Sequence, residues 1–163
     1  MRSFISLFII LFLSMAATAQ RKTTSELIPT QVDSIRLNVE LNREKEMISP
    51  VNETEVHELL GSSLLVGKDA KKFIKRIGAK SSYVNGRALL THHSLVFICY
   101  SKENVVLTVQ ISTFIRNINI YNDGSESFFG KNSKKMSNYL AKLLVRLNLY
   151  NRLAETGDTE GIE

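Results

Sequence analysis

The chain of 163 residues has one cysteine and no tryptophan, and both scarcities narrow its possible functions. A single cysteine cannot form an intrachain disulfide, so the fold has to be held by its hydrophobic core. The lack of tryptophan disfavours sugar-stacking sites and aromatic cages. Acidic residues are also sparse between positions 70 and 130, where only Glu103, Asp123 and Glu126 occur. This scarcity argues against a hydrolase that depends on paired carboxylates.

Motifs for a cofactor, a metal or a nucleophile are missing as well. Residues 61–69 (GSSLLVGKD) approximate a phosphate-binding loop, but five residues separate the glycines and an aspartate follows the lysine. The histidines have no spacing that suits a metal site, which needs three or four convergent ligands. Cys99 with His92 or His93 is the least unfavourable nucleophile pair. However, Cys99 lies in an apolar FICY run, where a free cysteine behaves as a buried apolar residue. We therefore expect no cofactor, no metal and no catalytic residue.

The first nineteen residues have the composition of a secretory signal peptide. Arg2 supplies a positive start, residues 4–15 form an apolar run, and residues 17–19 (ATA) form a small-x-small cleavage site. The apolar run is shorter than the roughly 20 residues that cross a bilayer, so an uncleaved anchor is the less favoured alternative. The junction resembles those of exported bacterial proteins, and no nearby cysteine offers a lipid attachment point. We expect a periplasmic or secreted location.

Residues 94–121 form the densest run of Val, Ile, Leu, Phe and Tyr after the signal peptide. Residues 105–111 alternate with a period of two, which is typical of a strand with one buried face, and residues 35–41 alternate in the same way. The polar residues 101–104 predict a hairpin turn. The alternation slips at Ser112-Thr113. Because residues 105–121 are too many for one regular strand, we expect a bulge or corner at that slip.

Three segments have the features of helices. Asn52 can cap a short helix over residues 52–60. Residues 67–78 carry an apolar stripe at helical spacing and end in glycine. Residues 133–153 carry a second stripe and form the longest expected helix. Between the last two helices, Asn85-Gly86 predicts a tight hairpin turn.

These elements predict one α+β domain over residues 32–153, with an antiparallel sheet of about four to five strands and helices packed on one face. A polar, flexible lead-in spans residues 20–31. Residues 154–163 contain four acids, two glycines and little that could pack, so we expect an acidic disordered tail. A chain of this length can bury enough apolar surface for a stable core.

Basic residues concentrate on two of the predicted helices. Residues 68–80 hold six basic and one acidic residue, and residues 131–153 hold six basic residues and no acidic one. The candidate basic faces consist of Lys71, Lys72, Lys75, Arg76, Lys134, Lys135, Lys142 and Arg146. Such faces can bind an anionic membrane or an acidic polymer, although helices docked by their apolar stripes also carry solvated basic backs. Nucleic acid is not an expected partner, because no recognition motif is present.

The order of elements over residues 61–121, a helix closed by Gly78 followed by a hairpin and paired strands, resembles small exported α+β domains. Examples are the beta-lactamase-inhibitor-like proteins and the outer-membrane assembly lipoproteins. The resemblance implies protein binding through a sheet face and loops, without catalytic residues. The lipoproteins are acylated at an N-terminal cysteine that this sequence lacks.

The leading hypothesis is therefore an exported, non-enzymatic module that binds a protein or another component of the cell envelope. Its candidate interaction face is Asn117, Asn119 and Tyr121, a polar and aromatic set that alternates with isoleucines. One alternative is a binder of anionic surfaces through the basic helix faces, with peripheral membrane contact. A second alternative is an exported enzyme of unrecognised type.

Overall fold

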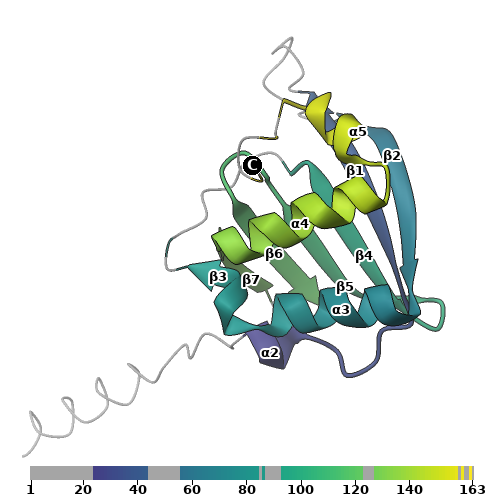
Figure 1. Ribbon diagram of the computed structural model, residues 1–163. Helices are drawn as coiled ribbons and strands as arrows, with labels where there is room; N and C mark the ends of the chain where they lie inside the picture. Colours follow the sequence, from purple (N-terminus) through teal and green to yellow (C-terminus); the bar gives the residue numbers. More distant parts are fainter. Residues whose placement is uncertain are drawn as a thin grey trace, which may run out of the picture.

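The computed structural model describes residues 24–43, 56–84, 86, 93–122, 127–157, 159 and 162. The predicted signal peptide, the first part of the lead-in and the expected helix start at Asn52 lie outside these residues. Within them, the chain has an α+β fold in which helices lie against one face of an antiparallel sheet (Figure 1). The predicted fold class and the antiparallel sheet are confirmed.

The sheet has seven strands in the described part of the chain, so the expected four to five strands were too few. In spatial order they are β2 (Val56–Val66), β1 (Ser34–Arg43), β4 (Leu95–Ser101), β5 (Asn104–Ile111), β6 (Asn117–Asn122), β7 (Ser127–Asn132) and β3 (Tyr83–Val84). All neighbouring strands run antiparallel. The β4–β5 hairpin lies where the sequence predicts it, with Lys102 in a left-handed conformation in the turn.

The segment 56–66 is a strand, and the helix expected over residues 52–60 is therefore wrong for its described part. β2 pairs with β1 along its full length, from Val56 opposite Arg43 to Val66 opposite Ser34. A bulge beside Val39 and Glu40 accommodates the extra residue in β2. Asn52 and Glu55 indicate a helix only by local capping chemistry, and pairing with a strongly alternating neighbour overrides such a local preference.

The slip at Ser112-Thr113 is a reversal of the chain and not a bulge within one long strand. β5 ends at Ile111, and β6 begins at Asn117 and runs back beside it, with Ile118 opposite Ile111. Arg116, at a φ of 59°, is one of the residues that turn the chain. The sequence shows where the alternation breaks, but a broken alternation does not distinguish a bulge from a turn.

The core lies between the sheet and the two longer helices. Leu37, Phe97, Val109 and Ile120 are opposite one another on four adjacent strands, and all four are fully buried. They form one apolar row across the sheet on the face that the helices cover. The alternation read in residues 35–41 and 105–111 is therefore the alternation between a covered face and an uncovered face.

Helices α3 (Gly67–Gly78) and α4 (Lys134–Arg146) both cross that covered face (Figure 1). α3 buries Ala70, Phe73 and Ile77, as its stripe predicts. The Ser133 side chain caps α4 by accepting a hydrogen bond from the backbone N–H of Met136. The helix expected over 133–153 is divided, because Asn148 adopts a φ of 56° and a short helix, α5 (Tyr150–Ala154), follows it.

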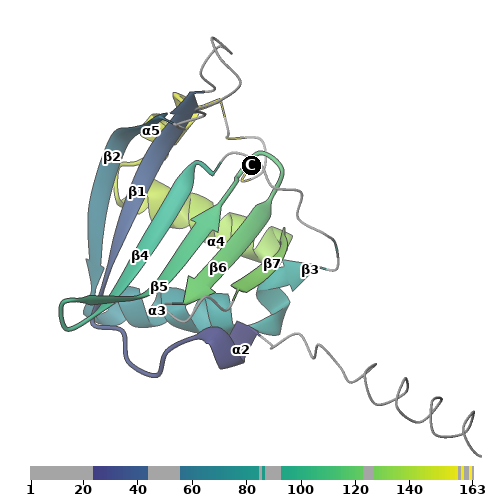
Figure 2. The same ribbon diagram turned by 180° about the vertical axis from the view of Figure 1, so that it is seen from behind.

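Figure 2 shows the molecule from behind, with the opposite face of the sheet toward the viewer. Neither α3 nor α4 lies across this face. Among the described helices, only α2 (Thr24–Leu27) is near this side. It lies at one end of the sheet, beside β6, β7 and α3. We call this side of the sheet the open face.

The expected acidic tail, where the structure describes it, includes a residue that packs. Ile162 is only 3% exposed and belongs to the same hydrophobic core as the strands and helices. The expectation that little in residues 154–163 could pack overlooked this single apolar side chain. The hairpin turn predicted at Asn85-Gly86 is not fully described, because Asn85 lies outside the described residues; just before it, Tyr83 and Val84 form β3 and pair with β7.

Candidate interaction surfaces

The predicted interaction face of Asn117, Asn119 and Tyr121 lies on β6, and its side chains point to the open face. Its two asparagines are nevertheless buried, with Asn119 only 1% exposed. Tyr121 is half-buried, so it is the member of the set that a partner could touch directly. Alternation predicts the direction of a side chain, but it does not show which neighbours cover it.

Asn119 has a polar side-chain partner, and a second polar pair, Ser94 with Thr113, is buried as well. The Asn119 Nδ2 atom lies 3.0 Å from the His93 Nε2 atom, and the Ser94 and Thr113 hydroxyls lie 3.1 Å apart. Burial raises the pKa of Tyr121, and a hydrogen bond from Asn119 opposes part of that rise. The Tyr121 ring meets the Phe129 ring edge to face, with centroids 5.8 Å apart. These contacts fix the end of the sheet and hold the Tyr121 ring in place.

Accessible apolar side chains on the open face come from other strands. Leu64 on β2 is 60% exposed, and Phe129 on β7 is also exposed. The strand register places Leu64 in a row of side chains that crosses the open face. In order across the sheet, the row consists of Leu64, Arg36, Ile98, Thr108 and Tyr121. The sequence does not predict the contribution of β2, because the capping chemistry around Asn52 indicates a helix over residues 52–60. The apolar run at 64–66 is the sequence signal that could have indicated a strand.

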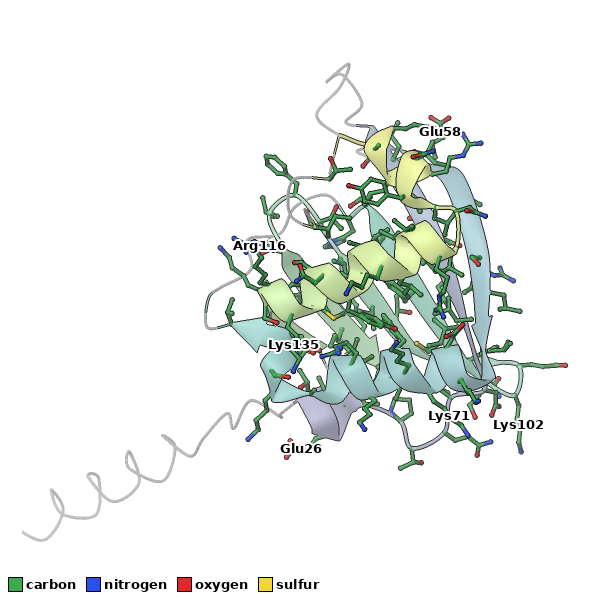
Figure 3. All side chains as sticks on the ribbon, viewed as in Figure 1. Glu26, Glu58, Lys71, Lys102, Arg116 and Lys135 are labelled. Atoms are coloured by element: carbon green, nitrogen blue, oxygen red, sulfur yellow. The ribbon has the colours of Figure 1, made fainter. Side chains whose placement is uncertain are left out.

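The basic residues predicted on two separate helices lie on one side of the molecule. Lys71 on α3 and Lys135 on α4 both project from the helix layer (Figure 3). The Lys72 Nζ atom lies 5.9 Å, and the Arg76 Cζ atom 5.5 Å, from the centre of the Tyr139 ring on α4. Arg146 forms an ion pair with Asp69 at 2.8 Å, again between the two helices. The two candidate basic faces thus join into one surface.

The candidate nucleophile and the candidate metal ligands do not lie in positions that favour catalysis or metal binding. Cys99 is fully buried on the covered face of β4, and burial raises the pKa of its thiol to about 12. His93 is hydrogen-bonded to Asn119, whose side chain is on the other face of the sheet, and His92 lies outside the described residues. Within the described segments, no three His, Cys, Asp or Glu side chains are grouped so that they could hold a metal ion.

None of the described helices is both long enough and apolar enough to cross a membrane. Comparison with known proteins finds no matching family model, no matching curated protein and no matching solved structure.

Proposed function

We propose that this protein is an exported, non-enzymatic binding module that contacts another protein through the open face of its sheet. The observation that carries the proposal is the one-sided cover of the sheet. α3 and α4 cover one face and leave the other uncovered (Figure 2). The strand register places exposed apolar side chains of β2 and β7 on the uncovered face. Exposed apolar side chains among polar ones are a common composition for a protein-binding surface.

The chemistry of the open face suits a partner with both apolar and polar groups. Leu64 and Phe129 lie near opposite ends of the face, with polar side chains of the central strands between them. Some polar groups of the open face are already fixed, since the Ser62 hydroxyl on β2 donates to the Asn38 side chain on β1 at 3.0 Å. A partner therefore meets an ordered surface, which lowers the entropy lost on binding.

The outer edge of β2 offers a second mode of contact within the same proposal. β2 is the end strand of the sheet and is 11 residues long. Three of its apolar side chains, Leu59, Leu64 and Val66, are more than half exposed. An extended segment of the partner could add to this edge by backbone hydrogen bonds, with its side chains against the leucines.

Export and the non-enzymatic character rest on the sequence. The first nineteen residues support export, and the absence of a recognisable catalytic motif supports a binding role. The likeness in element order to small exported domains is consistent with both. The partner is proposed to be a protein of the cell envelope.

The proposal predicts a partner that an affinity pull-down recovers from an envelope extract and that remains bound at high salt. Introducing lysine at Leu64 and Phe129 should weaken that recovery by roughly tenfold or more, because losing an apolar anchor of an interface costs about 2 kcal/mol or more. Quantitative mass spectrometry of the eluates measures the effect.

The matched control is Val145→Lys, which makes the same kind of change at an exposed position on α4. It should recover the partner as well as the unaltered protein does. If Val145→Lys lowers recovery of the partner as much as the double variant Leu64→Lys/Phe129→Lys does, the open face is not the binding surface. If the unaltered protein recovers no partner, the proposal is wrong as well.

A further inference from the structure

The solvent-facing side of α3 and α4 carries far more positive than negative charge. We call it the basic helix layer. Its cations are five on α3 and four on α4: Lys68, Lys71, Lys72, Lys75, Arg76, Lys134, Lys135, Lys142 and Arg146. The two helices contain a single acid, Asp69, and Arg146 already pairs with it. An excess of this size over two short helices produces a positive potential over the whole layer.

We propose that the basic helix layer docks this protein on the surface of an anionic phospholipid membrane. The proposal is independent of the open face, because the layer lies on the other side of the sheet (Figures 1 and 2). A docked molecule would therefore still present the open face to the solvent.

Contacts between the helices make the layer one continuous surface. Tyr139 lies within 6 Å of cations from α3, and the Arg146–Asp69 pair joins the helices near the other end of α4. Burial raises the pKa of Tyr139 to about 12, so its ring stays neutral beneath the cations at ordinary pH. The lysines around it are exposed and can approach lipid headgroups without a change in the fold.

The spread of the charges favours a membrane over a small anion. The cations are distributed along two helices, whereas a small anion is bound by groups that converge on one point. The layer also exposes an apolar side chain, since Val145 is 60% exposed. Lys142, Val145 and Arg146 are at i, i+3 and i+4 and share one side of α4. Basic groups around an apolar side chain are typical of a helix surface that rests on lipid headgroups.

The test is co-sedimentation of the full chain with phospholipid vesicles. The protein should bind vesicles that contain phosphatidylglycerol, should not bind pure phosphatidylcholine, and should be released as salt is raised. Replacing Lys71 and Lys135 by glutamine removes one exposed cation from each helix. Each basic residue near an anionic surface contributes about 1 kcal/mol, so the double variant should bind roughly thirtyfold more weakly.

The control variant, Arg36→Gln with Lys131→Gln, removes the same charge from the open face and should keep its binding within about twofold, since long-range effects are screened. Equal weakening of both variants would show that only net charge matters and would overturn the proposal. Binding to pure phosphatidylcholine, or no binding to either vesicle, would overturn it as well.

A second pair of measurements distinguishes a membrane from a free polyanion that carries the same phosphate chemistry. Val145→Asn should weaken binding to phosphatidylglycerol vesicles by several-fold and leave binding to inorganic polyphosphate unchanged, because only the vesicle has an apolar layer. If Val145→Asn weakens binding to vesicles and to polyphosphate equally, or weakens neither, the basic helix layer does not recognise a lipid surface.

Discussion

Replacing Phe97 by alanine will lower the free energy of unfolding by about 3–5 kcal/mol. Phe97 is fully buried in the apolar row of the sheet, and its ring stacks on Phe73 of α3 with centroids 4.1 Å apart. The substitution removes the contact that joins the centre of the sheet to a helix and leaves a cavity beneath it. Because small domains are stable by only about 5–15 kcal/mol, this variant should be close to unfolding at growth temperature.

Chemical denaturation followed by circular dichroism measures the loss. Phe114→Ala is the control, since Phe114 is exposed and its replacement should change stability by no more than about 0.5 kcal/mol. The double variant with Phe73→Ala should lose about 0.5–1.5 kcal/mol less than the sum of the single losses, which is the coupling typical of an aromatic pair. A loss at Phe97 no larger than that at Phe114 would be incompatible with the packing of α3 on the sheet.

Ile162→Ala will lower the free energy of unfolding by about 2 kcal/mol, at the lower end of the range for a buried isoleucine. Ile162 is buried in the core although the residues around it in the sequence are mostly polar. Residues 154–163 contain no other large apolar side chain, so this segment can separate from the core locally without unfolding the rest, which limits the loss. A disordered tail, as composition alone suggests, would give no loss.

The same denaturation measurement tests this second prediction. Ile162→Val keeps most of the side chain and should lose about 0.5–1.5 kcal/mol. Leu64→Ala is a control at an exposed aliphatic residue and should be nearly neutral. Ile162→Ala with the stability of the unaltered protein would show that the tail does not contribute to the core.

The parts of the fold that sequence analysis predicts are those whose pattern is both long and regular. The structure confirms the predictions for residues 35–41, for the β4–β5 hairpin and for α3. Each of these elements buries one face, so apolar residues recur every second position in the strands and at helical spacing in α3. The sequence pattern does not predict β2, nor the strand formed by residues 127–132. The local capping chemistry around Asn52 indicates a helix, whereas the partner that makes β2 a strand is β1.

For the candidate surfaces too, the sequence predicts some features and not others. The cations of α3 and α4 are evident in the sequence, but their union depends on contacts such as Arg146–Asp69, between residues 77 positions apart. Alternation assigns Asn119 to the correct face and cannot show that the residue is buried. The exposure of Leu64 follows from its place on an end strand, and strand order is a tertiary property that local patterns do not encode.

One face of the sheet is covered by α3 and α4, and the other is open. Thiol labelling of an Arg36→Cys variant distinguishes the two faces, because the variant has one thiol on each of them. Arg36 is exposed on the open face, whereas Cys99, near it on the neighbouring strand, is fully buried on the covered face with a thiol pKa of about 12. Mass spectrometry of the native variant should show rapid labelling of the introduced thiol only, and labelling of Cys99 only after unfolding. Rapid labelling of Cys99, or protection of the introduced thiol at position 36, would contradict a sheet that is covered on one side and open on the other.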